Sequence, residues 1–287
     1  MLHTVDLHTH SDCSDGALSV PDLMARAHES GVTTLAISDH DTLEQVRPSL
    51  LLGQTMGIRV ISAVEISATM GCLDDYHILG YRIDPDNSAL RDRLEQVRQS
   101  RIKRFGTILG ILQDLGFVVD TPKICSRRRQ SPGKPHIAKA ILGRSENAER
   151  LRREGIANTG QFIDAYLNEG KPAYVIREKL SLSEAIELIH GASGLAILAH
   201  PGWTYRNFDW NCGVELRHMK SLGIDGVEVF YTSHSEGLTL NLHAQAQKLG
   251  LIETAGSDFH SPDEIALGVL GAWNDYGLEP DFSPVTG

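Results

Sequence analysis

The feature that most constrains the fold is a repeated alternation between short apolar runs and longer helical patterns. In the first part of the chain the apolar runs are LHTVDL, TLAIS, IRVISAVEI and YHILGYRI, with helical patterns at residues 20–30 and 42–56. The rhythm resumes after residue 180, where LAILAH, GVEVF and LIETAGSD alternate with helical patterns near 213–222 and 236–249. Strands that alternate with helices in this way predict an α/β fold, and here a barrel of the TIM type.

A stretch in the middle of the chain follows a different pattern. It begins with the basic helical sequence LRDRLEQVRQSRIKRFGTILGILQDLG and continues through a connection rich in Pro, Gly and Arg into further helical segments. Because the β/α alternation stops before this stretch and resumes after it, we expect residues 1–87 and 176–287 to form one barrel domain. Residues 88–175 are then a helical insertion subdomain.

The charge balance and the cysteines argue against several classes of protein. Lys and Arg total 27 against 37 Asp and Glu, a formal charge of −10, which disfavours binding to duplex DNA or to an anionic membrane. The cysteines, Cys13, Cys72, Cys125 and Cys212, lack C-x-x-C spacing and indicate neither a disulfide framework nor a thiolate zinc site. With no secretory signal and no apolar run of about 18 residues, we expect a cytoplasmic protein without an obligate protein partner.

The segment DLHTHSDCSDG, residues 6–16, places two histidines at the end of the first predicted strand. His8 and His10 are alternate residues, so their side chains leave the same face of the strand and are able to bind one ion. An H-x-H pair by itself is more often two unrelated polar residues. Whether this pair belongs to a metal site depends on the residues found on the other predicted strands.

Other predicted strands also carry side chains that bind metals, mostly where the strand ends. These are Asp39 and His40 after TLAIS, Glu65 after VISAV, His77 at the start of HILGY, His200 in LAILAH, Glu228 in GVEVF, and Asp258 with His260 in GSDFH. The carboxyl ends of barrel strands meet at one rim, so these groups are expected to converge. Imidazole and carboxylate together suit Mn2+, Fe2+ or Zn2+, and this many ligands exceeds the needs of one ion. We therefore expect two to three divalent ions, with Glu65 as the bridging carboxylate.

The motifs DLHTHSDCSDG, SDHDT, VEIS, HILGY, AHPG and GSDFHSP resemble, in this order, those of the polymerase and histidinol phosphatase (PHP) family of metal-dependent phosphoesterases. The resemblance spans both halves of the chain and implies a distorted (β/α)7 TIM-like barrel. It assigns a first metal to His8, His10, Glu65 and Asp258, a second to Glu65, His77 and His200, and a third to Asp15, His40 and His260. Glu228 has no ligand role in this pattern and would instead orient a histidine.

The same resemblance implies a mechanism and a substrate class. A hydroxide held between two ions by Glu65, His77 and His200 would attack phosphorus, and no side-chain nucleophile is required. The sequences GKPHIAKAIL and YLNEGKPAYV make the chain most similar to 3′,5′-nucleoside bisphosphate phosphatases and to the related enzyme that trims RNA from its 5′ end. We therefore expect a small phosphorylated substrate, first the 3′-phosphate of a 3′,5′-bisphosphorylated nucleoside and second a short RNA 5′ end.

Candidate substrate contacts fall in two places. In the first motif, the candidates for the floor of the pocket are Ser11, Asp12, Cys13 and Ser14. In the insertion, which would cap the substrate, the candidates for binding a second phosphate are Arg101, Arg104, Lys134 and His136. Arg101 and Arg104, three residues apart, are equally well explained as a solvated helix face. Relatives commonly have arginine where this chain has Lys134, which keeps the cation but loses a bidentate contact.

Three other functions remain open from the sequence. A histidinol phosphate phosphatase would use the same chemistry, but its substrate has one phosphate, whereas the basic insertion favours a substrate with more. An amidohydrolase of similar barrel fold would need a lysine at a strand end as a carbamylated bridge, and Glu65 takes that position. A non-catalytic metal-binding module would show no activity even with metal present.

Overall fold

The computed structural model describes residues 3–70, 73–119, 133–176, 179–206, 210–263 and 269–287. The chain divides into two compact units, one formed by Met1–Glu95 with Lys179–Gly287 and the other by Gln96–Glu178. These boundaries lie eight and three residues after those expected from the sequence, which were residues 87 and 175. Cys72 and Cys125 lie outside the described residues.

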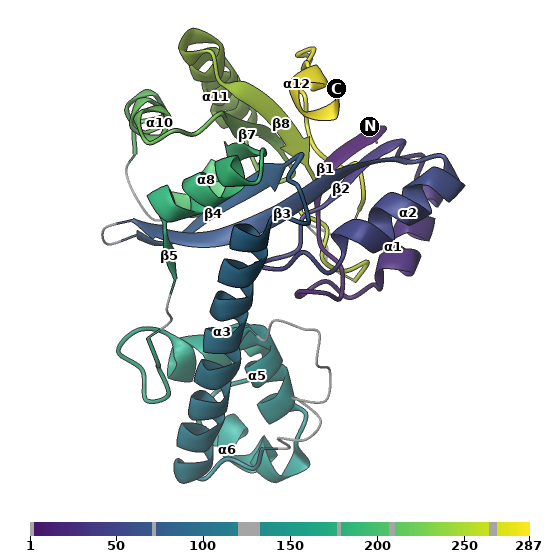
Figure 1. The fold of residues 1–287 in the computed structure, drawn as a ribbon. Helices are drawn as coiled ribbons and strands as arrows, with labels where there is room; N and C mark the ends of the chain where they lie inside the picture. Colours follow the sequence, from purple (N-terminus) through teal and green to yellow (C-terminus); the bar gives the residue numbers. More distant parts are fainter. Residues whose placement is uncertain (1–2, 71–72, 120–132, 177–178, 207–209, 264–268) are drawn as a thin grey trace. The chain divides into compact units, whose positions relative to one another are not determined.

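The first unit is built on an eight-stranded sheet that curves into a nearly closed barrel (Figure 1). Its strands are β1 (Val5–Thr9), β2 (Thr34–Ile37), β3 (Arg59–Met70), β4 (Leu73–Tyr81), β5 (Leu180–Ser181), β6 (Leu195–Leu198), β7 (Gly226–Tyr231) and β8 (Ile252–Gly256). They are ordered β1-β2-β3-β4-β6-β7-β8, and β5 pairs with β3. The ends of this order meet where the backbone N–H of Asp258 donates to the carbonyl of His8, at 2.8 Å. The α/β barrel predicted from the alternation is confirmed.

One pair of strands departs from the expected alternation. β3 and β4 are antiparallel, with Ser67 opposite His77, and β4 is also antiparallel to β6. Only residues 71–72 separate β3 from β4, which is too short for the crossover that a parallel pair needs. The expectation that Glu65 ends its strand is therefore wrong, because it lies in the middle of β3. His77, expected at the start of a strand, lies in the middle of β4.

Helices pack along the strands of this unit. They are α1 (Val20–Glu29), α2 (Val46–Met56), α8 (Leu182–Gly191), α9 (Pro201–Thr204), α10 (Cys212–Ser221), α11 (Glu236–Leu249) and α12 (Ser283–Thr286). In α1, α8 and α11 the residue before the helix is a serine that caps it, Ser19, Ser181 or Ser235. The hydroxyl of each serine accepts a hydrogen bond from a backbone N–H of the first turn. α1 and α2 lie side by side (Figure 1), and the buried face of α1 joins a core cluster with residues of β2. The caps of α1 and α11, Ser19 and Ser235, lie at the ends of the loops that follow β1 and β7.

The second unit is built of helices. Helix α3 (Ser88–Asp114) begins in the first unit and continues into the second, which also contains α5 (Lys134–Leu142), η1 (Ser145–Asn147), α6 (Ala148–Arg153), α7 (Thr159–Phe162) and the π-helical η2 (Ile163–Leu167). Its core gathers Phe105, Leu109, Phe117, Phe162 and Tyr166 among other apolar residues. No helix in the described ranges combines the length and apolar character that a membrane span requires.

We expect Asp6→Asn to destabilise the closure of the barrel. The buried carboxylate of Asp6 accepts hydrogen bonds from Ser257 N at 3.0 Å, Ser257 Oγ at 2.6 Å and Gly271 N at 2.7 Å. An amide puts an N–H2 group among these donors and leaves at least one without an acceptor, which lowers the free energy of unfolding by about 1–3 kcal/mol. Urea denaturation of the metal-free protein measures this loss, with exposed Asp92→Asn as the control. Equal free energies of unfolding for Asp6→Asn and Asp92→Asn would contradict this prediction.

Candidate metal centre

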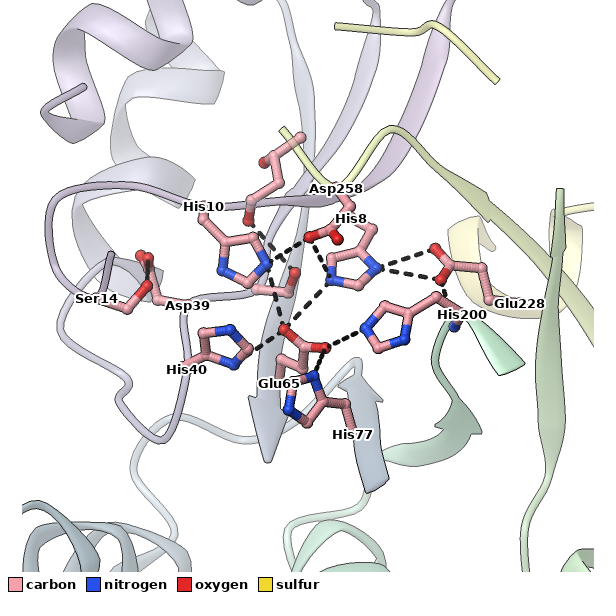
Figure 2. Close-up of polar contacts among 12 residues, drawn as sticks. His8, His10, Ser14, Asp39, His40, Glu65, His77, His200, Glu228 and Asp258 are labelled. Carbon is pink, nitrogen blue, oxygen red and sulfur yellow. Dashed lines mark hydrogen bonds and ion pairs between the residues drawn. The ribbon is translucent and has the colours of Figure 1, made fainter. Parts of the chain in front are cut away.

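The structure brings the nine candidate metal ligands together in one cluster in the barrel unit. All of them except Asp15 and His260 are labelled in Figure 2. Most of them come from the carboxyl ends of strands: His8 in β1 and His10 directly after it, His40 after β2, His200 after β6, and Asp258 with His260 after β8. Asp15 follows in the loop after β1. Glu65 and His77 reach the same place from the middle of the β3–β4 hairpin. Segments far apart in the sequence therefore supply a single site.

Glu65 lies at the centre of this cluster, with its two carboxylate oxygens facing different histidines (Figure 2). Its Oε2 is 3.3 Å from His8 Nε2, 3.2 Å from His10 Nε2 and 3.0 Å from His40 Nδ1. Its Oε1 is 2.9 Å from His77 Nδ1 and 3.1 Å from His200 Nε2. Such a division is what a carboxylate between two ions requires.

The other two carboxylates extend the cluster on the side of His10. Asp258 Oδ1 is 3.1 Å from His10 Nε2 and 3.4 Å from His8 Nε2. Asp15 lies 3.4 Å from His260 Nε2 and 3.8 Å from His40 Nε2, measured from its nearer oxygen in each case. His40 thus faces Glu65 through one ring nitrogen and Asp15 through the other.

The donor atoms fit divalent ions. Two atoms that each lie about 2.1 Å from one ion are separated by about 3.0–3.4 Å at tetrahedral or octahedral angles, which matches most of the distances above. Several of these buried atoms have no hydrogen-bond partner, among them His8 Nε2, both ring nitrogens of His10, His40 Nδ1, Glu65 Oε2 and His77 Nδ1. Buried polar atoms are normally satisfied, so their concentration here indicates a group that completes the site. The chain therefore supplies a set of ligands suited to metal ions.

The charges of the site support the same conclusion. Burial by itself would raise the pKa of Glu65, but the imidazoles of His40, His8 and His77 hold that pKa well below its usual range. Burial by itself would lower the pKa of His8, yet the carboxylates of Glu228, Glu65 and Asp258 raise it well above its usual value. These carboxylates therefore favour a positive charge at His8, whether a proton or a metal ion, whereas burial outweighs them at His40 and lowers its pKa to about 4.

The loop after β1 is held by Asp39. Its buried carboxylate accepts hydrogen bonds from Ser11 N at 2.8 Å, from Ser11 Oγ at 2.5 Å and from Ser14 Oγ at 2.5 Å. Burial raises the pKa of Asp39 to about 6, although these hydrogen bonds oppose the shift. The hydroxyls of Ser11 and Ser14 therefore fix the loop that carries Asp15. Of its other members, Cys13 is half-buried, and burial raises the pKa of its thiol to about 12.

The candidate phosphate-binding residues of the insertion all lie in the second unit. Arg104 Nε donates to the carbonyl of Val175 at 2.6 Å, and Lys134 Nζ donates to Asn168 Oδ1 at 2.8 Å. His136 Nδ1 accepts from the backbone N–H of Gly133 at 3.2 Å. Arg101 is partly buried on α3. Their part in binding substrate stays a prediction.

Two features of the site escaped the sequence patterns. Tyr231 donates a hydrogen bond to Asp258 Oδ2 at 2.9 Å, and nothing in the run GVEVFY marks it as different from a packing residue. The backbone is also strained at two of the candidate ligands, since His200 has a φ of 26° and Asp258 a φ of 55°. Each such conformation costs on the order of 1–3 kcal/mol in a residue other than glycine, and such strain clusters at functional sites.

Comparison with known families and proteins agrees with this geometry. Residues 6–114 match the family described as the PHP domain. The chain is 29% identical to a 3′,5′-nucleoside bisphosphate phosphatase of Chromobacterium violaceum, over 98% of this chain and 93% of the relative. It is 32% identical to a 5′-3′ exoribonuclease of Haemophilus influenzae, over 91% of this chain and 92% of the relative.

A solved structure shares the fold across almost the whole chain. It belongs to a Bifidobacterium adolescentis protein predicted to be a metal-dependent phosphoesterase, with a TM-score of 0.79 and 24% identity. The match covers 95% of this chain and 93% of the other. The barrel and its helical insertion are thus found together in a protein of distant sequence.

We expect Gly256→Ala to displace His8. A Cβ at position 256 would lie 2.2 Å from the Cβ of His8 and 2.8 Å from its backbone nitrogen, and neither atom is able to move without shifting β1. Binding of Mn2+, measured by calorimetry, should weaken by about tenfold or more, which corresponds to roughly 1.4 kcal/mol. Gly237→Ala in α11 is the control, because a Cβ there meets no atom within 4 Å. Unchanged Mn2+ affinity in Gly256→Ala would show that this close packing does not position His8.

Proposed function

We propose that this chain, which belongs to the PHP-domain family of metal-dependent phosphoesterases, hydrolyses a phosphate monoester of a small, multiply phosphorylated substrate. The first candidate is the 3′-phosphate of a 3′,5′-bisphosphorylated nucleoside, and the second is the 5′ end of a short RNA. Relatives named for these two activities each align with more than nine tenths of this chain.

The observation that carries the proposal is the position of Glu65 between two groups of histidines. Its Oε2 faces His8, His10 and His40, and its Oε1 faces His77 and His200. Hydrolysis of a phosphate ester needs a strong nucleophile and a positive environment for the phosphoryl oxygens, and a site built around a bridging carboxylate is able to hold both.

We propose that two to three divalent ions occupy the cluster. The residues that would hold them are His8, His10, Asp15, His40, Glu65, His77, His200, Asp258 and His260. Bound ions of this kind lower the pKa of water enough to give hydroxide near neutral pH and neutralise the phosphoryl oxygens. Mn2+, Fe2+ and Zn2+ all accept this combination of imidazole and carboxylate.

The chain's own residues orient and enclose the reaction. Glu65, His77 and His200 would hold the nucleophile on the side of Glu65 Oε1. The ring of Trp203 lies 6.0 Å from that of His77 and 5.5 Å from that of His200, measured between ring centres, and covers both ligands with apolar surface. Cys13, with its raised pKa, keeps its thiol protonated and is not a nucleophile.

Substrate selection would rest on groups beyond the metal ligands. The loop formed by Ser11, Asp12, Cys13 and Ser14 would form the floor of the pocket. Arg101, Arg104, Lys134 and His136 would bind the phosphate that is not cleaved, since cationic side chains form strong, charge-assisted hydrogen bonds with phosphate. A substrate with one phosphate would gain nothing from these contacts.

We expect the Mn2+-loaded protein to release inorganic phosphate from a 3′,5′-bisphosphorylated nucleoside and to leave a nucleoside 5′-monophosphate. Chromatography of the product and a phosphate assay measure both outcomes. Dialysis against a chelator should abolish the activity, and added Mn2+ should restore it. Histidinol phosphate and an amide substrate are tested in parallel. Turnover of histidinol phosphate alone, or of the amide alone, would replace this function with the corresponding alternative.

Lys134→Ala should impair the bisphosphorylated substrate selectively. Loss of a cation that binds the second phosphate should lower kcat/KM for that substrate by about tenfold, roughly 1.4 kcal/mol, and mainly through KM. Turnover of a nucleoside 3′-monophosphate should be unaffected. Lys139→Ala, on an exposed position of the same helix α5, is the matched control. Equal losses for both substrates would assign Lys134 to the stability of the insertion instead.

A further inference from the structure

Strand β7 contributes no candidate metal ligand, yet it places two buried polar side chains against the ligands of other strands. Glu228 is fully buried and Tyr231 is 2% exposed. In a regular strand, residues three apart point to opposite faces of the sheet. A β-bulge between Glu228 and Phe230 changes the register against β8, which pairs Glu228 with Thr254 but Tyr231 with Gly256. Both side chains are thereby turned toward the cluster, an effect that bulges have beside active sites.

Glu228 contacts two candidate ligands from two different strands (Figure 2). His8 Nδ1 lies 3.0 Å from Glu228 Oε1 and 3.2 Å from Oε2. The backbone N–H of His200 donates to Oε2 at 2.8 Å. In a neutral His8 whose Nδ1–H donates to this carboxylate, Nε2 is the nitrogen with a lone pair for a metal ion, and it is Nε2 that faces Glu65 and Asp258. The same carboxylate holds His200 at its strained φ of 26°.

Tyr231 performs the corresponding task for Asp258. Its hydroxyl donates to Asp258 Oδ2 at 2.9 Å, whereas Oδ1 of the same carboxylate faces His8 and His10. The ring of Tyr231 also packs against that of His200, with ring centres 5.5 Å apart. Oδ2 of Asp258 thus accepts a hydrogen bond from Tyr231, and Oδ1 is left to face the cluster.

We infer that β7 is the positioning strand of the metal centre, with Glu228 setting the orientation of His8 and His200 and Tyr231 setting that of Asp258. The inference rests on the proposed function only in taking the cluster to bind divalent ions. Three ligands from three different elements are held by two side chains of one strand, so their loss should weaken metal binding before it weakens folding. Partners of this kind typically change metal affinity by about 10–100-fold.

The opposing explanation is that these two side chains only satisfy buried polar groups. In that case their replacement would destabilise the protein without a specific effect on metal. The chain offers matched controls for both. Glu253 in β8 is another buried carboxylate paired with an imidazole, accepting from His243 Nδ1 at 2.9 Å and from Gln247 Nε2 at 2.7 Å. Tyr166 is 8% exposed and, like Tyr231, donates its hydroxyl to a carboxylate oxygen, Glu154 Oε2, at 2.6 Å.

The experiment compares Glu228→Gln with Glu253→Gln and Tyr231→Phe with Tyr166→Phe in the full-length protein. Glutamine keeps one acceptor oxygen for two donors, and phenylalanine removes only the hydroxyl. Mn2+ affinity is measured by calorimetry, and the free energy of unfolding of each metal-free variant by urea denaturation. We expect Mn2+ affinity to fall by about 10–100-fold in Glu228→Gln and Tyr231→Phe, and by less than about twofold in the controls.

Two results would overturn the inference. One is Mn2+ affinity within about twofold of wild type in both β7 variants. The other is a loss of affinity in the controls as large as in the β7 variants, at equal loss of stability. If Glu228→Gln fails to fold, Tyr231→Phe still decides, because it keeps the ring and its packing. The readout needs no substrate, so a failure of the proposed phosphatase activity leaves this test intact.

Discussion

The site depends on one buried carboxylate placed among imidazoles. Glu65 is fully buried in the middle of β3, where an unpaired charge would be strongly unfavourable. It is tolerated because five histidines surround it, from β1, from the loops after β2 and β6, and from β4. The antiparallel β3–β4 hairpin makes this possible, because it brings His77 beside Glu65 from the neighbouring strand.

A second layer of buried polar groups holds these ligands in place. Asp39 fixes the loop that carries Asp15, Asp6 ties β1 to the segment after β8, and Gly256 allows β8 to approach His8. Each of these residues is a carboxylate that accepts several hydrogen bonds or a glycine in a tight contact. The rigidity that metal-dependent chemistry needs is thus provided by contacts between strands that are distant in the sequence.

Much of the site was predictable from the sequence, because ligands at the ends of successive strands must converge at one rim of a barrel. His8, His10, His40, His200 and Asp258 follow that rule. The sequence also marks Glu65 and His77 as candidate ligands, but not their place inside two antiparallel strands, since an apolar run does not reveal the direction in which a strand is paired. The bulge that turns Tyr231 toward Asp258 depends on register against β8 and leaves no mark in GVEVFY.

A crystal of the Mn2+-loaded protein tests most directly whether Glu65 bridges two ions, as we propose. An anomalous difference map locates manganese independently of any assumption about the ligands. We predict at least two peaks beside Glu65, one within coordination distance of Oε2 and near His8 and His10, the other within coordination distance of Oε1 and near His77 and His200. A single peak bound by both oxygens, or no peak at Glu65, would contradict the account.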